Sequence, residues 1–348
     1  MDPLLWLPLT CLLLSLVLTG AVRRYALARG VIDHPGARSS HTAPTPRGAG
    51  VAVAASFLLT LTALGALDLV DAGLQTALTG ACLIACAIGF VDDHRHVAAR
   101  WRLLAHGTAA AWALWALGGA PDLSLFGLDL PSGPVATLLC VIGLTWLLNL
   151  YNFMDGIDAL AGIEAVTVTL GGALLLWAAG HADQTVPALL LGAASLGFLA
   201  WNLPPARIFL GDSGSGLLGI ALGVLALHAA RLDAALLWGW LILLGVFVVD
   251  ATLTLLRRAL RGEAVWQAHR SHAYQRLARR WRSHGKVAAA VAAVNLLWLL
   301  PCAWLVVGGR IDAGPGLLLA YAPLALLMRW LGAGSADAEP VQPDPPRD

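Results

Sequence analysis

Long apolar runs separated by short polar segments make up most of the chain. A membrane-spanning helix needs about 20 mostly apolar residues, and the runs predict about eleven such helices. They are expected at 4–20, 49–67, 73–91, 103–119, 135–151, 160–179, 185–201, 214–230, 234–255, 287–307 and 314–331. The pattern therefore predicts an all-α polytopic membrane protein.

The two ends of the chain need separate interpretation. The first run has the length of a signal peptide, but Arg23 and Arg24 follow it rather than precede it, and no small-residue cleavage site is evident. We interpret it as the first membrane helix. The segment 333–348 is rich in Ala, Asp and Pro, which predicts a disordered C-terminal tail. Residues 1–332 are expected to form a single transmembrane domain.

Basic residues are distributed unevenly between the loops at the two ends of the predicted helices. An odd number of helices places the termini on opposite sides, and the positive-inside rule then selects the orientation. With the N-terminus outside, 20 of the 22 Lys and Arg residues lie on the inner side, and only Arg231 and Arg310 lie outside. The sequence therefore predicts an outer N-terminus and a cytoplasmic C-terminus.

Composition agrees with a membrane protein and argues against other classes. The chain is 58% hydrophobic and 12% charged, whereas soluble domains are roughly 25% charged. Its basic residues are spread over loops beside the membrane, so nucleic acid is not an expected partner, and membrane lipid or a phosphorylated substrate explains them better. The five cysteines lie in apolar runs without metal-ligand spacing, which predicts buried thiols.

Polar motifs interrupt the apolar pattern on the predicted inner side, where ionisable groups at membrane depth indicate function. The motif VDDHRH places Asp92 and Asp93 at the end of the third helix. Two adjacent carboxylates can bind a cation or accept a proton. A solvated start of a loop is the structural alternative.

The motif NLYNFMDGIDALAG lies at the end of the fifth predicted helix. Asn149, Asn152 and Asp155 recur every three residues and share one helical stripe, and Asp158 follows three residues later. Amide and carboxylate oxygens on one stripe suit Mg²⁺, or the hydrogen-bond donors of a sugar or uracil. A plain polar helix end is the alternative.

The motif FLGDSGSGLLG begins the eighth predicted helix with Asp212. Helix-start N–H groups favour anions, and a carboxylate beside them could hold Mg²⁺ against a phosphate. A simple N-cap formed by Asp212 or Ser213 is the alternative.

Two loops add further polar residues. The late segment RRALRGEAVWQAHRSHAYQRLARRWR carries His269, Arg270 and His272 among many cations and could clamp a pyrophosphate, with binding of lipid headgroups as the alternative. The first inner loop, DHPGARSSHTAPTPRGAG, is too rich in Pro and Gly to form a helix. Its polar candidates are Asp33, Arg38, His41 and Arg47. We interpret the isolated His106, His181, His228 and His284 as structural or solvated.

Taken in order from Asp33 to Gln275, these motifs resemble the polyprenyl-phosphate N-acetylhexosamine-1-phosphate transferase family. The resemblance implies transfer of an N-acetylhexosamine 1-phosphate from a UDP-sugar to undecaprenyl phosphate, with release of UMP, to initiate a lipid-linked cell-surface polysaccharide. It implies Mg²⁺ as the cofactor, with Mn²⁺ as an alternative. The expected location is the bacterial inner membrane, with residues 1–332 as the catalytic domain and the active site on the cytoplasmic side.

The same resemblance assigns roles to residues of this chain. It implies catalytic roles for Asp92, Asp93 and His272 and metal binding by Asn152 and Asp212. The substrate-binding residues it implies are Asp33, Arg38, His41, Arg47, Asn149, Asp155, Asp158, His269 and Arg270. The late loop reads HRSHAYQRL, so Tyr274 stands where many family members have a further His. This departure weakens the case for a second catalytic histidine.

Several alternatives stay open from the sequence. Intramembrane carboxylates also serve ion-coupled transporters, although no inverted repeat is evident and the motifs lie at helix ends. A phospho-MurNAc-pentapeptide transferase of peptidoglycan synthesis and an inactive lipid-binding relative are further readings. The sequence does not choose the donor sugar, the pathway, a direct or a two-step mechanism, or the oligomeric state, for which a homodimer is one option.

Overall fold

The computed structural model describes residues 3–36, 43–95, 97–264 and 269–336. Each of the predicted apolar runs coincides with one helix or with two or three consecutive helical segments. The first eight helices are α1 (Pro3–Arg29), α2 (Gly50–Ala66), α3 (Ala72–His94), α4 (Ala99–Ala116), α5 (Pro134–Met154), α6 (Leu160–Ala178), α7 (Val186–Asn202) and α8 (Asp212–Leu232). A short 3₁₀ helix, Ala182–Gln184, precedes α7.

The C-terminal part is less regular than the pattern predicts. The expected helix 234–255 is divided into α9 (Ala234–Leu243) and α10 (Gly245–Leu260), which meet at 69°. The expected helix 287–307 comprises α12 (His284–Val294), a π-helical segment (Asn295–Leu299) and α13 (Leu300–Val307). A short helix that the pattern did not predict, α11 (Ala273–Trp281), precedes them, and α14 (Ala313–Trp330) follows.

Several of these helices can cross a bilayer. In the described ranges, seven are long and apolar enough by length and composition, or eight if the bent α9–α10 pair is one span. The helix α2 is apolar but shorter, with 17 residues. The chain is therefore a polytopic membrane protein.

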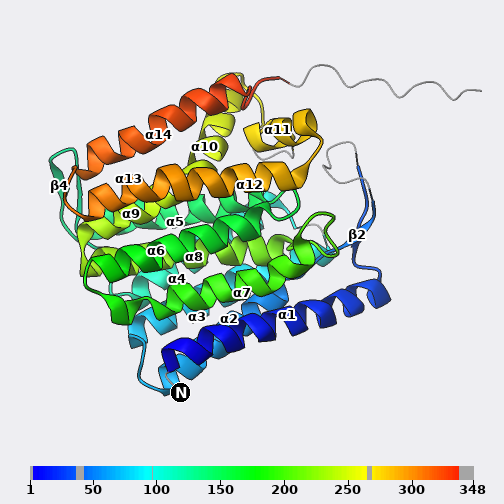
Figure 1. Ribbon diagram of the computed structural model, residues 1–348, viewed down its shortest axis with the longest axis horizontal. Helices are drawn as coiled ribbons and strands as arrows, with labels where there is room; N and C mark the ends of the chain where they lie inside the picture. Colours follow the sequence, from blue (N-terminus) through cyan, green and yellow to red (C-terminus); the bar gives the residue numbers. More distant parts are fainter. Residues whose placement is uncertain (1–2, 37–42, 96, 265–268, 337–348) are drawn as a thin grey trace, which may run out of the picture.

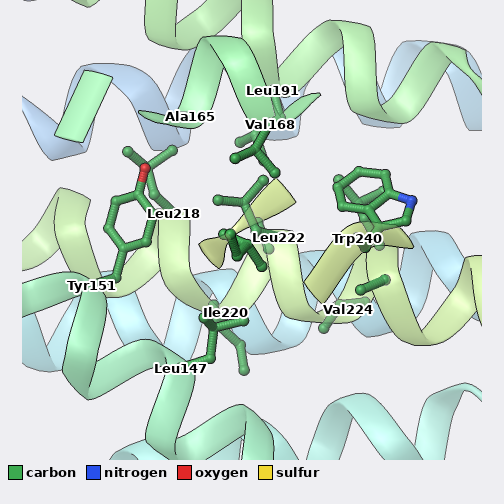
Figure 2. Close-up of a cluster of buried hydrophobic side chains, with 14 of the residues drawn as sticks. Leu147, Tyr151, Ala165, Val168, Leu191, Leu218, Ile220, Leu222, Val224 and Trp240 are labelled. Atoms are coloured by element: carbon green, nitrogen blue, oxygen red, sulfur yellow. The ribbon is translucent and has the colours of Figure 1, made fainter. Parts of the chain in front are cut away.

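The helix α8 is the centre of the bundle. It packs against α3, α5 and α9, and Figure 2 shows its Leu218 and Leu222 beside Tyr151 of α5 and Trp240 of α9. A Cβ at Gly219 would lie 2.8 Å from the Cα of Leu148, so glycine is needed for this close approach to α5. Close packing of this kind is a main source of helix association in membranes, and it fixes the position of the first residue of α8, Asp212.

The two ends of the bundle carry different short elements (Figure 1). One end carries the start of α1 and the hairpin of β3 (Leu123–Leu125) and β4 (Leu128–Leu130). The other end carries α11 and the two-residue strands β1 (Ile32–Asp33) and β2 (Thr45–Pro46), in which Asp33 pairs with Thr45. Arg47 extends β2 by bridging to Phe209, just before α8.

The segment after α14 begins with packed residues. The backbone N–H of Gly334 donates to the Ser271 carbonyl at 2.8 Å, and Arg276 donates to the carbonyl of Ser335 at 2.7 Å. Ala333 is completely buried. Residues 333–336 of the predicted tail therefore form part of the folded bundle, and 337–348 lie outside the described residues.

Candidate active site

A polar pocket of about 200 Å³ opens at the end of the bundle that carries β1, β2 and α11. Loops and helix ends between Asp33 and His284 line it. The lining residues are Asp33, Arg47, Asp93, Asn152, Asp155, Gly156, Ile157, Asp158, Asn202, Phe209, Leu210, Gly211, Asp212, Gln275 and His284. The structure thus brings together seven of the predicted site residues, from four of the five predicted motifs. We call this space the acidic pocket.

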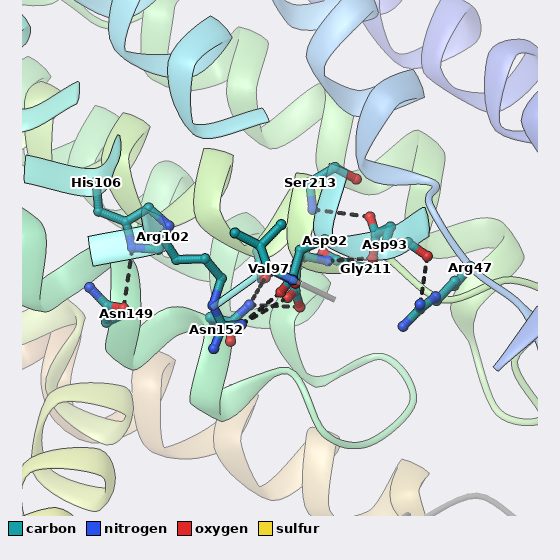
Figure 3. A network of polar contacts seen from close by, with 12 residues as sticks. Arg47, Asp92, Asp93, Val97, Arg102, His106, Asn149, Asn152, Gly211 and Ser213 are labelled. Atoms are coloured by element: carbon teal, nitrogen blue, oxygen red, sulfur yellow. Dashed lines mark hydrogen bonds and ion pairs between the residues drawn. The ribbon is translucent and has the colours of Figure 1, made fainter. Parts of the chain in front are cut away.

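Asp93 is fixed by the start of α8. Its two carboxylate oxygens accept hydrogen bonds from the backbone N–H groups of Asp212, at 3.0 Å, and Ser213, at 3.2 Å (Figure 3). Gly211 has a φ of +77°, and a Cβ there would lie 2.7 Å from both oxygens. Arg47 donates to the Asp93 backbone carbonyl. Asp93 is 3% exposed, so it serves as the cap of α8 and positions Asp212.

Asp92 belongs to a different set of contacts. Its carboxylate accepts from the Val97 backbone N–H at 2.6 Å and from Arg102 Nη1 at 2.7 Å. The same Nη1 lies 3.4 Å from Asp212 Oδ2, so Arg102 bridges the two carboxylates. The Asp212 side chain is 36% exposed and that of Asp92 only 7%. Asp212 is therefore the carboxylate that a ligand can reach.

Asn152 holds the other side of Asp212. Its Nδ2 donates to Asp212 Oδ1 at 2.9 Å and to the Ser215 hydroxyl at 3.0 Å. Because the Asn152 amide donates a hydrogen bond to this carboxylate, Asn152 orients Asp212.

A second pocket of about 140 Å³ meets the acidic pocket at Asn152 and Asp212. Its other lining residues are Ile88, Gly89, Ala99, Arg102, Leu103, His106, Leu148, Asn149, Phe153 and Gly216. Leu103 is also 56% exposed on the outer surface of α4, so this pocket lies next to the lipid-facing side of the bundle. We call it the membrane-side pocket.

His106 and Asn149 pair within the membrane-side pocket. His106 Nδ1 lies 3.2 Å from Asn149 Oδ1 (Figure 3). The sequence interpretation placed His106 apart from the motifs, whereas the structure places it in contact with one of the predicted substrate-binding residues.

Four carboxyl groups surround the acidic pocket from the α3, α5 and α8 sides. Asp155 is the C-cap residue of α5. Its pKa is raised well above the ordinary value, first because its carboxyl group is removed from water and second because of the charges of Asp212, Asp93 and Asp158. Asp158 accepts from the Ala206 backbone N–H at 3.1 Å, and its Oδ1 lies 3.3 Å from His284 Nδ1. Mutual repulsion between these carboxyl groups favours a bound cation.

The residues of the acidic pocket fit a hard divalent cation. No three His, Cys, Asp or Glu side chains in the described ranges form a complete metal site. Mg²⁺, however, is usually held by one or two carboxylates together with substrate phosphates and water. The accessible carboxylate of Asp212, oriented by Asn152 and surrounded by excess negative charge, meets that requirement.

The late loop carries three of the predicted site residues, His269, Arg270 and His272. His272 is 2% exposed and does not line either pocket, and its ring lies 4.8 Å from that of His269. Burial, followed by the charge of His272, lowers the pKa of His269 to about 3. His269 is therefore neutral at physiological pH, and its Nδ1 lies 3.0 Å from the Ser271 hydroxyl. Arg270 is half-buried beside it, and its carbonyl accepts a hydrogen bond from Arg279. Arg38 and His41 lie outside the described residues.

Tyr274 is buried behind Gly156 and next to Gln275, two residues that line the acidic pocket. Its hydroxyl donates to the Phe153 carbonyl at 3.0 Å. Burial, with the charges of Asp250 and Asp155, raises its pKa well above the ordinary value, so the phenol stays protonated. The tyrosine at this position therefore supplies a contact to the end of α5.

Replacing Gly156 by Ala is expected to lower the free energy of unfolding by about 1–3 kcal/mol, the range for overpacking. The new Cβ would lie 2.2 Å from the Tyr274 hydroxyl and 3.2 Å from Gln275 Nε2. Tyr274→Phe in the same chain should recover part of the loss because it removes the colliding oxygen. Thermal unfolding of the purified protein measures both. Gly143→Ala, where a Cβ meets nothing within 4 Å, is the matched control. An unchanged unfolding midpoint for Gly156→Ala would show that Tyr274 and Gln275 can move to accommodate the methyl group without loss of stability.

Several site residues were not identifiable from the sequence. Arg102, His106 and His284 lack a motif of their own, and Asn202 directly follows the predicted helix 185–201. Phe209 begins the motif FLGDSGSGLLG but was not among the predicted site residues. Arg102 reaches Asp92 across the turn between α3 and α4, and His284 is 126 residues from Asp158. The one available signal for Arg102 is its place in the basic inner loop.

The chain is similar to known proteins over most of its length. Residues 75–230 match the sequence model of the family described as Glycosyl transferase family 4. A protein of Bacillus subtilis named probable undecaprenyl-phosphate N-acetylglucosaminyl 1-phosphate transferase is 30% identical over 275 residues, covering 76% of this chain and 75% of the relative.

Mycobacterial relatives are similar to the same extent. Decaprenyl-phosphate N-acetylglucosaminephosphotransferase of Mycobacterium tuberculosis is 31% identical over 316 residues, covering 80% of this chain and 76% of the relative. The protein of the same name from Mycolicibacterium smegmatis is 31% identical over 319 residues, covering 79% and 75%.

Proposed function

The chain belongs to glycosyl transferase family 4, and from this premise we propose that it transfers N-acetylglucosamine 1-phosphate from a UDP-sugar to a polyprenyl phosphate such as undecaprenyl phosphate, releasing UMP. The observation that carries the proposal is the meeting of two unlike pockets at Asp212 and Asn152. One is acidic and lies among the loops, and the other lies beside the lipid-facing surface. A reaction between a polar donor and a lipid acceptor needs such a pair.

The acidic pocket suits the donor. A nucleotide diphosphate carries its charge with a metal ion, and the excess of carboxylates here accepts that ion. Asp212 would hold Mg²⁺, with Asn152 orienting the carboxylate. When bound, the ion neutralises the diphosphate and the departing UMP. The acidic pocket also offers aromatic and amide surface from Phe209, Asn202 and Gln275.

The membrane-side pocket suits the acceptor. A polyprenyl chain gains about 0.8 kcal/mol for each buried CH₂, so it stays in the bilayer and presents only its phosphate to the protein. Arg102 is the cation at the junction of the two pockets. It would bind the acceptor phosphate, and Asp92 would keep the guanidinium in place.

Direct transfer fits these contacts. An oxygen of the acceptor phosphate forms a bond to the phosphorus that carries the sugar. The bond from that phosphorus to the bridging oxygen breaks, and UMP leaves with the electron pair. A two-step route would need a free aspartate nucleophile. The oxygens of Asp93 are occupied by backbone N–H groups and the carboxylate of Asp92 by Val97 and Arg102, which supports the direct route.

The membrane orientation follows from the charge asymmetry. The acidic pocket lies at the end to which 20 of the 22 basic residues were assigned. By the positive-inside rule this end faces the cytoplasm, where UDP-sugars are made. We therefore place the protein in the bacterial inner membrane with its active site on the cytoplasmic side.

A transfer assay tests this function. Membranes with the protein, labelled UDP-N-acetylglucosamine, Mg²⁺ and undecaprenyl phosphate should yield butanol-extractable label and UMP in equal amounts. EDTA should abolish the reaction, and Mg²⁺ or Mn²⁺ should restore it. Label on Asp92 or Asp93 in the absence of acceptor would indicate the two-step route.

The same assay separates the alternatives. UDP-MurNAc-pentapeptide in the donor panel tests the peptidoglycan reaction. If no donor of the panel gives a lipid product, the enzymatic function is wrong and ion-coupled uptake becomes the hypothesis to measure.

A further inference from the structure

Asp250 is a fully buried carboxylate in α10 that none of the predicted motifs contains. Ionisable groups inside membrane helices are costly and rare unless they serve a function. Asp250 lies in the second half of the bent α9–α10 pair. Its contacts therefore show what the buried charge does.

Four groups surround the Asp250 carboxylate. The backbone N–H groups of Ala273 and Tyr274 donate to Oδ1 and Oδ2 at 2.9 and 3.0 Å. The Thr254 hydroxyl donates to Oδ1 at 3.1 Å, and His272 Nδ1 lies 3.5 Å from the same oxygen. Three of these four contacts come from the first residues of α11 or from the residue before it. Asp250 thus ties α11 to α10.

This arrangement adds to the local cap of α11. The first N–H groups of a helix have no partner within it, and a Ser, Thr, Asp or Asn at the N-cap would usually satisfy them. The N-cap of α11 is His272, whose backbone N–H donates to Gln275 Oε1 at 3.4 Å in a capping box, and whose ring is stacked with those of His269 and Phe153. The N–H groups of Ala273 and Tyr274 are bonded to Asp250. A local cap would satisfy the N–H groups equally well, but it would not fix the direction of α11 relative to α10.

The first turn of α11 forms part of the wall of the acidic pocket. Gln275 lines that pocket. The Tyr274 hydroxyl is bonded to the Phe153 carbonyl and lies against Gly156, which lines the acidic pocket too. A shift of α11 would therefore move both the Gln275 side chain and the 155–158 loop that carries two of the pocket's carboxylates.

We infer that Asp250 is a positioning residue for the nucleotide-sugar donor: it fixes α11 so that Gln275 and the 155–158 loop keep the geometry of the acidic pocket. This inference rests on the proposed function, because it takes the acidic pocket as the donor site. Asp250 itself is fully buried and lines neither the acidic pocket nor the membrane-side pocket.

The test compares donor affinity with stability. Asp250→Asn keeps the size of the side chain but places an NH₂ group against one of the two α11 N–H groups. We expect the Kd and the KM for UDP-N-acetylglucosamine to rise at least tenfold, while the KM for undecaprenyl phosphate changes less than threefold. Thr254→Val is the matched control, since it removes a hydrogen bond to the same carboxylate without touching α11. Its donor Kd should stay within twofold of the wild-type value.

A purely structural role predicts a different pattern. It would lower the unfolding midpoint and the active fraction of both variants and leave the donor Kd of the remaining folded protein unchanged, which would overturn the inference. If Asp250→Asn does not fold, Tyr274→Phe takes its place. It breaks the link between α11 and Phe153, and an unchanged donor Kd would again overturn the inference.

The measurement also separates this inference from the proposed function. Wild-type protein that binds no UDP-sugar and transfers no label contradicts the proposed function. Wild-type binding with equal affinity in Asp250→Asn contradicts only the positioning role.

Discussion

Asp212→Asn is expected to lower the transfer rate at least about 100-fold while leaving the protein folded. Loss of one preorganised electrostatic group in an active site costs about 100- to 1,000-fold, or roughly 2.7–4 kcal/mol. Asp212 is shared by both pockets, and Asn152 and Arg102 contact it from opposite sides. Substitution by Asn keeps the shape but removes the charge that would hold the metal ion.

The assay of labelled UDP-N-acetylglucosamine with undecaprenyl phosphate measures this loss. The unfolding midpoint should change little, because the backbone N–H of Asp212, which bonds to Asp93, is retained. Asp129→Asn is the matched control, since Asp129 is exposed in β4 at the opposite end of the bundle. If Asp212→Asn kept more than a tenth of the wild-type rate at saturating Mg²⁺, Asp212 would not be the metal-binding carboxylate.

Arg102→Ala is expected to lower kcat/KM for undecaprenyl phosphate about 10- to 100-fold. Hydrogen bonds to charged groups contribute about 1.5–3 kcal/mol, and Arg102 is the guanidinium between Asp92 and Asp212. Its removal leaves two carboxylates facing the incoming phosphate. Arg102→Lys should recover only part of the loss, since an ammonium lacks the planar fork of a guanidinium.

The pattern of kinetic constants decides the role of Arg102. An acceptor site predicts that the KM for undecaprenyl phosphate rises more than the KM for the UDP-sugar. Arg100→Ala is the control, because Arg100 lies on the same helix but is exposed and stacks on Trp101. A larger rise in the KM for the donor would assign Arg102 to the diphosphate instead.

The acidic pair illustrates how far the sequence interpretation reaches. Adjacent carboxylates in VDDHRH indicate a polar site, and the structure places both beside Asp212. Successive residues of a helix point in different directions, so Asp93 meets the start of α8 and Asp92 meets Arg102. That difference depends on where α8 and α4 pack, and neither position is encoded locally.

The late loop shows where pattern reasoning is weakest. Many cations in one segment indicate a contact with phosphate, which stays a prediction. The sequence did not predict that His272 is buried, or that burial lowers the pKa of His269 to about 3. Burial decides whether a histidine carries a charge, and burial here comes from α10 and from the short helix α11, which the apolar pattern did not predict. The carboxylate that organises this region, Asp250, is hidden in an apolar run and is recognised only by its contacts.

By itself, the sequence determined the helical membrane class, the positions of the apolar runs and the gathering of the acidic motifs at one end of the bundle. Those features follow from local periodicity and from the cost of placing charge in lipid, and both can be read along the chain. Only the tertiary structure decided the bend between α9 and α10, the different contacts of Asp92 and Asp93, and the pairing of Asp158 with His284. These depend on contacts between residues far apart in sequence, which packing selects and periodicity does not record.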